Sequence, residues 1–118
     1  MRDYLRTKET QEKYSQYKAE GFLMKGCALC KEARLVKKFK YWKIIKNRFP
    51  HDRIAKINHI IIPKRHTIYE KLNKIEKEEF EKIKLNYIEK KYDVMLEATN
   101  KRKSIPEHHH IHLTILKD

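Results

Sequence analysis

A short segment near the C-terminus alternates with a period of two residues, and this pattern constrains the fold more than any other. Four of the seven histidines fall within residues 108–112. Because side chains two apart on a β-strand share a face, one face would carry histidines about 7 Å apart, namely His108, His110 and His112. The other face would be mostly apolar, with His109, Ile111, Leu113 and Ile115. The pattern predicts a strand over 108–116 with a core on one side and a site on the other.

A purification tag is the alternative interpretation of residues 106–110. A tag is normally a longer, unbroken run at a chain terminus. Here Ile111 interrupts the histidines, and residues 113–116 continue as Leu-Thr-Ile-Leu, a segment with high β-propensity. We therefore favour a strand that carries a site.

The chain upstream predicts a helix followed by strands. A polar stretch without glycine or proline indicates an exposed helix over residues 7–20. Residues 35–46 are rich in β-branched and aromatic side chains, which indicates a strand or a tight hairpin. We expect a turn at 50–52 and a buried strand over 59–62 that is stopped by Pro63.

Residues 67–92 change to a helical period. The expected apolar face of this helix consists of Leu72, Ile75, Phe80, Ile83, Tyr87 and Ile88. A short strand over 94–98 and the strand over 108–116 would follow. This order of elements favours an α+β fold with a mostly antiparallel sheet and helices packed on one face.

Three further motifs precede the histidine row. Residues 59–66 read His-Ile-Ile-Ile-Pro-Lys-Arg-His, residues 47–50 read Asn-Arg-Phe-Pro, and residues 27–30 read Cys-Ala-Leu-Cys. Together with His-x-His-x-His, and in this order, they resemble the histidine triad (HIT) family of nucleotide hydrolases and transferases. The resemblance spans residues 27–116, about three quarters of the chain. It implies a five-stranded antiparallel sheet with two helices, usually paired as a homodimer.

The length of 118 residues indicates one structural domain with a modest core. Within it we expect residues 1–26 to form an N-terminal helix and lead-in loop, and residues 27–118 to form the HIT-like catalytic domain. The longest aliphatic runs are three or four residues, which predicts no membrane span. Residues 1–7 lack an apolar signal core, so we expect a cytoplasmic location.

The resemblance implies a role for each histidine. His110 would attack the α-phosphate of a nucleoside phosphoryl compound and carry the nucleotide as a nucleotidyl-histidine intermediate. This suits neutral imidazole, which is a good nucleophile and a good leaving group near neutral pH. His112 would hydrogen-bond the same phosphate or help to protonate the leaving group. His59 would complete the catalytic set, and its alternative role is a structural histidine at the start of a strand.

Three polar residues are the candidates for binding the nucleotide. The resemblance implies that Asn47 binds the ribose hydroxyls, although a loop asparagine also shapes turns. Ser104 resembles a side chain that reaches the phosphate, and Asn100 begins the basic loop before the histidine row. Asn58 replaces the glycine that the family commonly has before His59. The basic loop, which also lacks glycine, would favour a larger or more anionic substrate.

A zinc site is the expectation for the two cysteines. The Cys-x-x-Cys spacing supplies two ligands from one turn. In the zinc-containing HIT relatives, the other two ligands match His66 and His108 here, so the resemblance implies a structural zinc on Cys27, Cys30, His66 and His108. A redox pair and two buried thiols are the alternatives. His51 and His109 are substitute ligands, although His109 should face the core.

The net charge of +13 favours anionic ligands without choosing among them. Abundant lysine and isoleucine can reflect AT-rich coding, and a phosphate-handling enzyme also benefits from a positive field. The leading hypothesis is a nucleotide hydrolase or nucleotidyl transferase. The alternatives are a HIT-type enzyme acting on nucleotidylated nucleic acid ends, and a zinc-stabilised basic module that only binds nucleic acid.

Overall fold

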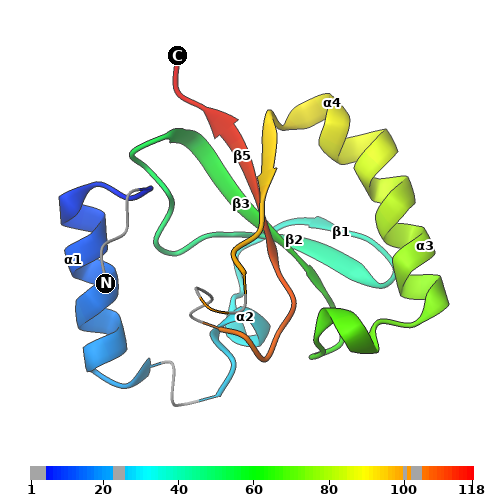
Figure 1. The fold of residues 1–118 in the computed structure, drawn as a ribbon, viewed down its shortest axis with the longest axis horizontal. Helices are drawn as coiled ribbons and strands as arrows, with labels where there is room; N and C mark the ends of the chain where they lie inside the picture. The colour runs from blue at the N-terminus through cyan, green and yellow to red at the C-terminus, as the bar shows by residue number, and fades with distance from the viewer. Residues whose placement is uncertain (1–4, 23–25, 100, 102–104) are drawn as a thin grey trace.

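The computed structural model describes residues 5–22, 26–99, 101 and 105–118. Within these residues, five strands form one antiparallel sheet in the order β1-β2-β3-β5-β4 (Figure 1). The strands are β1 (Leu35–Lys38), β2 (Trp42–Lys46), β3 (Ala55–Pro63), β4 (Val94–Leu96) and β5 (Ile111–Leu116). The α+β class and the five-stranded antiparallel sheet are as predicted, and residues 35–46 form the hairpin of β1 and β2.

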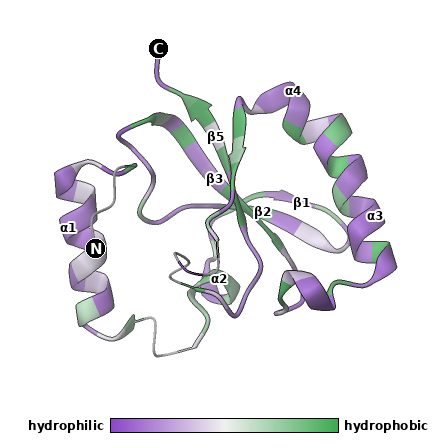
Figure 2. Ribbon diagram, in the orientation of Figure 1, coloured by the Kyte–Doolittle hydropathy of each residue, from purple (hydrophilic) through white to green (hydrophobic). Residues whose placement is uncertain are grey.

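The helices are α1 (Lys8–Ala19), α2 (Ala28–Lys31), α3 (Lys74–Ile83) and α4 (Glu89–Lys91). In the view of Figure 1, α1 lies on one side of the sheet, α3 and α4 lie on the other, and α2 lies between them. A 3-10 turn, η2 (Tyr69–Lys71), precedes α3, and a π-helical turn, η3 (Lys84–Ile88), joins α3 to α4. The helix expected over 7–20 is confirmed as α1, which is mostly hydrophilic in Figure 2. No helix of the described ranges combines the length and the apolar character needed to cross a membrane.

The long helix starts later than the periodicity predicts. Asn73 and Glu76 form a capping box, in which each side chain bonds the backbone N–H of the other residue, and this fixes the start of α3 at Lys74. Glu76 is only 3% exposed and pairs with Arg65, whereas Ile75 is 55% exposed. The prediction that Ile75 belongs to the apolar face is therefore wrong.

The main core lies between α3 and one face of the sheet. Trp42 anchors the helix to β2, because its indole N–H donates to the carbonyl oxygen of Glu76 at 2.8 Å. Nine buried side chains form this cluster: Trp42, Ile44, Ile61, Leu72, Ile83, Ile88, Tyr92, Ile111 and Leu113. Burial of this apolar surface holds the long helix on the sheet.

A smaller cluster covers the opposite face of the sheet. There Leu29 of α2 packs with Ile45, Ile60 and Ile62, which alternate with the residues of the main core. The registers place Ile45, Ile60 and His112 side by side on β2, β3 and β5. This is the face of the sheet on which the histidine row lies, and α2 covers part of it.

Two strand boundaries differ from the predictions. β3 begins at Ala55 rather than His59, because residues 55–58 continue the pairing with the end of β5. β5 begins at Ile111 rather than His108. Pro63 ends β3 and has no N–H to extend the ladder, and the N–H of His109 donates instead to the carbonyl oxygen of Thr67 at 2.7 Å.

Candidate metal centre and histidine site

Two cysteines and two histidines from three segments converge beside the sheet. Their ligand atoms, from Cys27, Cys30, His66 and His108, all lie within 4.8 Å of one another. Cys30 Sγ is 3.3 Å from His66 Nδ1 and 3.2 Å from His108 Nδ1. Cys27 Sγ is 3.4 Å from His108 Nδ1. The structure thus brings together the four residues predicted as ligands, and the cluster could hold a metal ion.

The local fold explains why the two cysteines point the same way. Cys27 is the N-cap of α2 and Cys30 lies within that helix, so the two thiols share one side of a single turn. Gly26 precedes them with a φ of +101°, where a side chain would be strained and a Cβ would lie 3.2 Å from the side chain of Lys31. Glycine allows the chain to enter the turn.

His108 is oriented as a metal ligand by its second ring nitrogen. Its Nε2–H donates to the carbonyl oxygen of Pro63 at 3.0 Å, and His108 is fully buried. This hydrogen bond leaves the lone pair on Nδ1, the nitrogen that faces the two thiols. Burial is the main cause that lowers the pKa of His108, which favours the neutral, metal-binding form of the ring.

The pKa of Cys30 links the charge of its sulfur to the binding of a cation. Burial, followed by the hydrogen bond from Cys27, raises the pKa of Cys30 to about 11. A thiolate here is therefore unfavourable unless a positive charge lies between the sulfur atoms. A bound metal ion supplies that charge and makes thiolates of both cysteines.

Alternate histidines before and within β5 point to opposite faces of the sheet. His109 lies on the α3 face, with its ring 6.1 Å from that of Trp42. His110 and His112 lie on the opposite face, and their ring centroids are 5.7 Å apart. The alternation predicted for this segment is therefore present, although only residues from 111 onward are regular strand.

The backbone carbonyl of His108 holds His110 in one tautomer. Nδ1 of His110 is 2.9 Å from the carbonyl oxygen of His108, so Nδ1 carries the proton and donates. The lone pair of a neutral ring then lies on Nε2. The residue is 8% exposed, so the ring is almost enclosed by protein. This is the geometry of an imidazole whose Nε2 acts as a base or a nucleophile.

His51 is the third histidine of this group, and the sequence indicates it only as a substitute metal ligand. Its ring lies 4.2 Å from the ring of His112 with an angle of 30° between the planes. His51 stands in the loop between β2 and β3, where no periodicity indicates the direction of a side chain. Its position within the turn predicted at 50–52 is the only signal in the sequence.

The environment keeps His112 uncharged. Burial, followed by the nearby His51, His110 and Arg6, lowers the pKa of His112 well below its usual value. Within the described part of the chain, no hydrogen-bond partner reaches the buried Nδ1 of His112. A neutral ring with an unbonded polar atom next to His110 can form a hydrogen bond with a ligand.

A chain of amide hydrogen bonds fixes the loop that carries His51. The Oδ1 atom of Asn58 accepts from Nδ2 of Asn47 at 2.8 Å and from the backbone N–H of His51 at 3.0 Å. The Nδ2 atom of Asn58 donates to Oγ1 of Thr114 at 3.2 Å. Asn58 is therefore a positioning residue that ties the loop to β5, a role that a glycine could not perform.

Helix α1 holds the same loop from the outside. Asp52 accepts hydrogen bonds from the backbone N–H of Thr7 at 2.8 Å and from the hydroxyl of Thr10. Phe49 stacks on Tyr14 of α1, with ring centroids 5.0 Å apart. The N-terminal helix, for which the sequence indicated no role, thus positions the loop of His51.

The prediction that His59 lies beside the histidine row is wrong. His59 pairs with Leu113, so its side chain lies on the α3 face, where Nδ1 is 2.6 Å from the hydroxyl of Tyr92. Burial, followed by Lys91 and Lys46, lowers its pKa. Its surroundings fit the alternative role of a hydrogen-bonded structural histidine.

The three nucleotide-binding candidates have different outcomes. Asn47 lies in the loop next to His51, and its Oδ1 accepts from the backbone N–H of Phe49 at 3.0 Å, so it also shapes the turn. Asn100 and Ser104 lie outside the described residues.

Neither a protein-family model nor a curated protein matches this sequence. The functional interpretation of the site therefore depends on the motifs of the sequence and on the geometry described above.

Proposed function

We propose that the protein is a HIT-type nucleotide hydrolase or nucleotidyl transferase that acts at the α-phosphate of nucleoside phosphoryl compounds. The observation that carries the proposal is the hydrogen bond from His110 Nδ1 to the carbonyl oxygen of His108. The ring of His112 lies 5.7 Å from that of His110, and the ring of His51 lies 4.2 Å from that of His112. This arrangement combines a ring nitrogen that can attack phosphorus with two further imidazoles on the same face of the sheet.

In this proposal the reaction has two displacements on phosphorus. The Nε2 lone pair of His110 forms a bond to the α-phosphorus while the bond to the leaving group breaks, and the leaving group takes up a proton. Water or another acceptor then forms a bond to phosphorus as the phosphorus–nitrogen bond breaks. The neutral ring of His112 hydrogen-bonds a phosphate oxygen, and water supplies the proton that the leaving group takes up.

The metal in this proposal is a structural zinc ion. In a tetrahedral site with bonds of about 2.3 Å to sulfur and about 2.0 Å to nitrogen, sulfur and nitrogen lie about 3.5 Å apart. The sulfur–nitrogen separations of 3.2–3.4 Å in the cluster are close to this value. A zinc ion held by Cys27, Cys30, His66 and His108 would fasten α2 to the ends of β3 and β5, and no reaction step uses it.

The test is nucleotide release by the purified protein and two variants. The substrates are adenosine and guanosine phosphoramidates, diadenosine polyphosphates and adenylated DNA ends, with nucleoside monophosphate as the measured product. His110→Ala should abolish release, whereas His59→Asn should retain it because His59 lies on the other face. Release that survives in His110→Ala, or no release from any substrate, would contradict the proposal.

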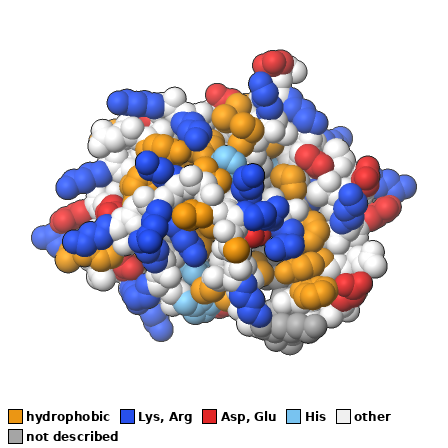
Figure 3. All heavy atoms as spheres, turned by 180° about the vertical axis from the view of Figure 1, so that it is seen from behind, with side chains coloured by type: hydrophobic (Ala, Val, Ile, Leu, Met, Phe, Trp, Pro, Cys, Tyr) orange, Lys and Arg blue, Asp and Glu red, His pale blue; other side chains and the backbone are white. Residues whose placement is uncertain are grey.

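The high positive charge favours one variant of this proposal, in which the nucleotide is attached to a nucleic acid end. Figure 3 shows lysine and arginine side chains spread over the face seen from behind, with acidic groups mostly toward its edges. A field of this kind attracts a polyanion without selecting a sequence. Release from adenylated DNA that falls steeply with salt, while release from phosphoramidates does not, would favour this variant.

A basic module that binds nucleic acid without turnover is the second candidate, and the net charge of +13 is its support. It predicts that His110→Ala leaves both nucleic-acid affinity and every measured activity unchanged. Fluorescence anisotropy with labelled single- and double-stranded DNA, at several salt concentrations, tests it.

A homodimer is part of the proposal, because the HIT resemblance implies one. Strands β1 and β4 are the two edges of the sheet, and an edge strand has backbone groups that a second copy can pair with. Sedimentation velocity over a range of protein concentrations would show whether the chain dimerises.

A further inference from the structure

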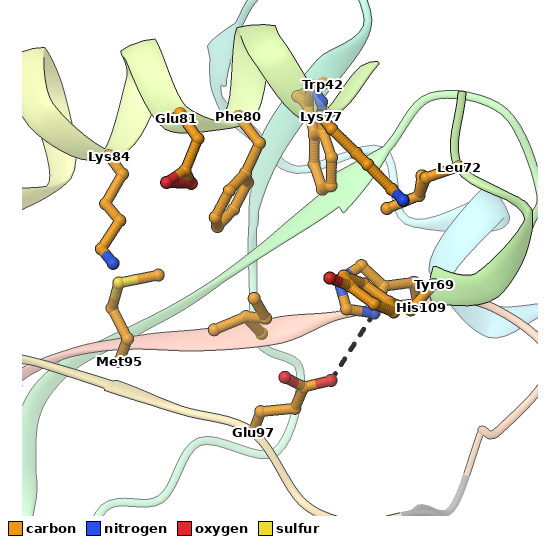
Figure 4. A pocket seen from close by; sticks show the side chains of 11 residues that line it. Trp42, Tyr69, Leu72, Lys77, Phe80, Glu81, Lys84, Met95, Glu97 and His109 are labelled. Atoms are coloured by element: carbon orange, nitrogen blue, oxygen red, sulfur yellow. Dashed lines mark ion pairs between the residues drawn. The ribbon is translucent and has the colours of Figure 1, made fainter. Parts of the chain in front are cut away.

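The hairpin of β1 and β2, with the residues that flank it, carries seven cations and no acid. Residues 33–48 contain these two arginines and five lysines: Arg34, Lys37, Lys38, Lys40, Lys43, Lys46 and Arg48. In the cavity under α3, by contrast, Lys77 and Lys84 are matched by Glu81 and Glu97 (Figure 4). The net positive charge of the chain is therefore concentrated on the hairpin and not in this cavity.

The arginines of this segment have acidic partners, but its lysines do not. One carboxylate oxygen of Glu32 lies 2.8 Å from Arg34 and 3.6 Å from Arg48. In the described part of the chain, no ion pair joins any of the five lysines to a carboxylate. Glu79 also contacts the hairpin, where it accepts a hydrogen bond from a backbone N–H of the turn at 2.6 Å. Five lysines beside this one acid leave a positive excess.

Two of the lysines repel each other across the hairpin. Lys38 and Lys43 lie directly opposite each other in the antiparallel pairing of β1 and β2. Like charges at such positions share a face and destabilise a hairpin. Glu107 acts on Cys30, as Lys43 does, but it forms no ion pair with either lysine among the described residues. This repulsion would be relieved by an anion from outside the chain.

Protection of the sheet edge does not explain all five lysines. Lysines on an exposed edge strand prevent its pairing with other chains, and this accounts for Lys37 and Lys38 on β1. Lys43 and Lys46 belong to β2, which is paired with β1 on one side and with β3 on the other. The hairpin therefore carries more positive charge than the protection of an edge requires.

Two of the lysines lie over aromatic rings. Nζ of Lys40 is 5.4 Å from the ring centroid of Tyr41, and Nζ of Lys37 is 5.9 Å from that of Tyr87. Both rings are half-buried, so part of each is open to solvent beside a cation. Lysines that bind phosphates, with rings on which bases stack, are the elements of a surface for single-stranded nucleic acid.

We propose that the β1–β2 hairpin binds a single-stranded nucleic acid, with its phosphates toward the five lysines and its bases toward Tyr41 and Tyr87. A duplex fits less well, because its bases are stacked on one another and hidden from the rings. An anionic lipid surface shares the charge but has no bases to stack. The proposal does not depend on nucleotidyl transfer at His110, so either can fail without the other.

The test is fluorescence anisotropy with a short, fluorescein-labelled oligothymidylate that carries no attached nucleotide, at several salt concentrations. Lys38→Gln combined with Lys43→Gln should weaken binding about tenfold. The combined change should also reduce the slope of log affinity against log salt by about 1.4, since each lysine on a single-strand phosphate contributes about 0.7. Tyr41→Leu should weaken binding about fivefold and leave this slope unchanged, because it removes stacking and no charge.

The matched control is Lys8→Gln combined with Lys13→Gln, which removes the same charge from α1. Both side chains are exposed, and Lys13 pairs with Glu9, so the affinity should change less than about twofold. Circular dichroism shows whether each variant keeps the fold. Metal analysis is added for the hairpin variant, because Lys43 lies near Cys30.

Four outcomes would overturn the proposal. Equal weakening by the hairpin pair and the α1 pair would mean that only the total charge matters. Tighter binding of a duplex than of the single strand would exclude stacking on the rings. Binding to phosphatidylserine vesicles without binding to the strand would assign the lysines to a lipid surface. Loss of strand binding in His110→Ala would place the strand at the histidine site instead.

Discussion

The two faces of the sheet are stabilised in different ways. Among the described residues, the apolar cluster under α3 contains nine buried side chains, and the cluster on the opposite face contains four. The opposite face carries instead the cysteine–histidine cluster, the three grouped histidines and the hydrogen bonds of Asn58. One face is thus held by burial, and the other by cross-links between polar groups.

This difference shows how a small domain can carry buried polar side chains. Polar groups out of contact with water are tolerated only when they are hydrogen-bonded or bound to a ligand. On the polar face, His108 is bonded to Pro63, His110 to the backbone of His108, and Asn58 to Thr114. The apolar face under α3 supplies stability that does not depend on any of these bonds.

Removing the metal ion that we propose for the cysteine–histidine cluster should produce the largest effect. Chelation, or Cys30→Ser, should lower the free energy of unfolding by about 3 kcal/mol or more and the melting temperature by about 10 °C or more. The reason is that α2 and the residues around His66 and His108 would lose their common link. Calorimetry with and without chelator, together with metal analysis of the protein, measures this.

The control for this prediction is His59→Asn, which changes a histidine on the α3 face and should leave the metal content unchanged. A melting temperature that does not respond to chelation would show that the four residues do not hold a stabilising metal ion.

Two core truncations should separate the faces. Leu113→Ala and Ile60→Ala should each cost about 2–4 kcal/mol, because both side chains are buried. The cost of Ile60→Ala should shrink after chelation, since Ile60 packs with Leu29 of α2, whereas the cost of Leu113→Ala should not change. Urea unfolding of both variants, with and without chelator, measures how much the metal changes the cost of each substitution, which is its coupling energy with the metal. Equal coupling would contradict the division between the faces.

The parts of the site that could be predicted from the sequence are those that local patterns determine. The spacing of Cys27 and Cys30, and the alternation around His110, are local patterns, so the sequence alone could indicate them. The face of the sheet on which His59 lies could not be predicted from a local pattern. His59 precedes Ile60, Ile61 and Ile62, which are all buried because β3 is a central strand covered on both faces, so the hydrophobic period is lost.

His51 and Ile75 show two further limits of the sequence. The direction of His51 depends on the bonds from its loop to Asn58 and to α1, and these contacts join segments far apart in the chain. Ile75 has the right spacing for the apolar face, but it lies in the first turn of α3. There the capping box and the pair of Glu76 with Arg65 bury the glutamate instead.

Loosening α1 should have a moderate effect that is confined to the polar face. Asp52→Asn should cost about 1–2 kcal/mol, because Asp52 accepts bonds from Thr7 and Thr10. Hydrogen exchange should become faster in α1 and in residues 47–53, and stay unchanged in α3. Glu9→Gln is the control, since Glu9 is exposed and makes a surface pair with Lys13. Faster exchange in α3 as well would mean that the faces do not respond separately.

The smallest expected effect is a dependence of stability on pH through His112. The pKa of His112 in the folded protein lies well below 6.5, chiefly because of burial, so between these two values the unfolded chain binds more protons. The contribution of His112 is fully present above pH 6.5 and is lost as the pH falls toward the folded pKa. Between pH 6.5 and 5.5 this single group should cost about 1 kcal/mol.

The variant that isolates this effect is His112→Asn, compared with the unchanged protein by urea unfolding at pH 7.5, 6.5 and 5.5. The cysteine–histidine cluster and His59 are the same in both proteins, so their own pH dependence cancels in the difference. The variant should lose less stability than the parent protein between pH 6.5 and 5.5, by about 1 kcal/mol. Parallel curves would mean that His112 is protonated as readily in the folded protein as in the unfolded chain. His112 would then be able to carry a positive charge beside His110. The proposal that a neutral ring of His112 binds the phosphate would then be wrong.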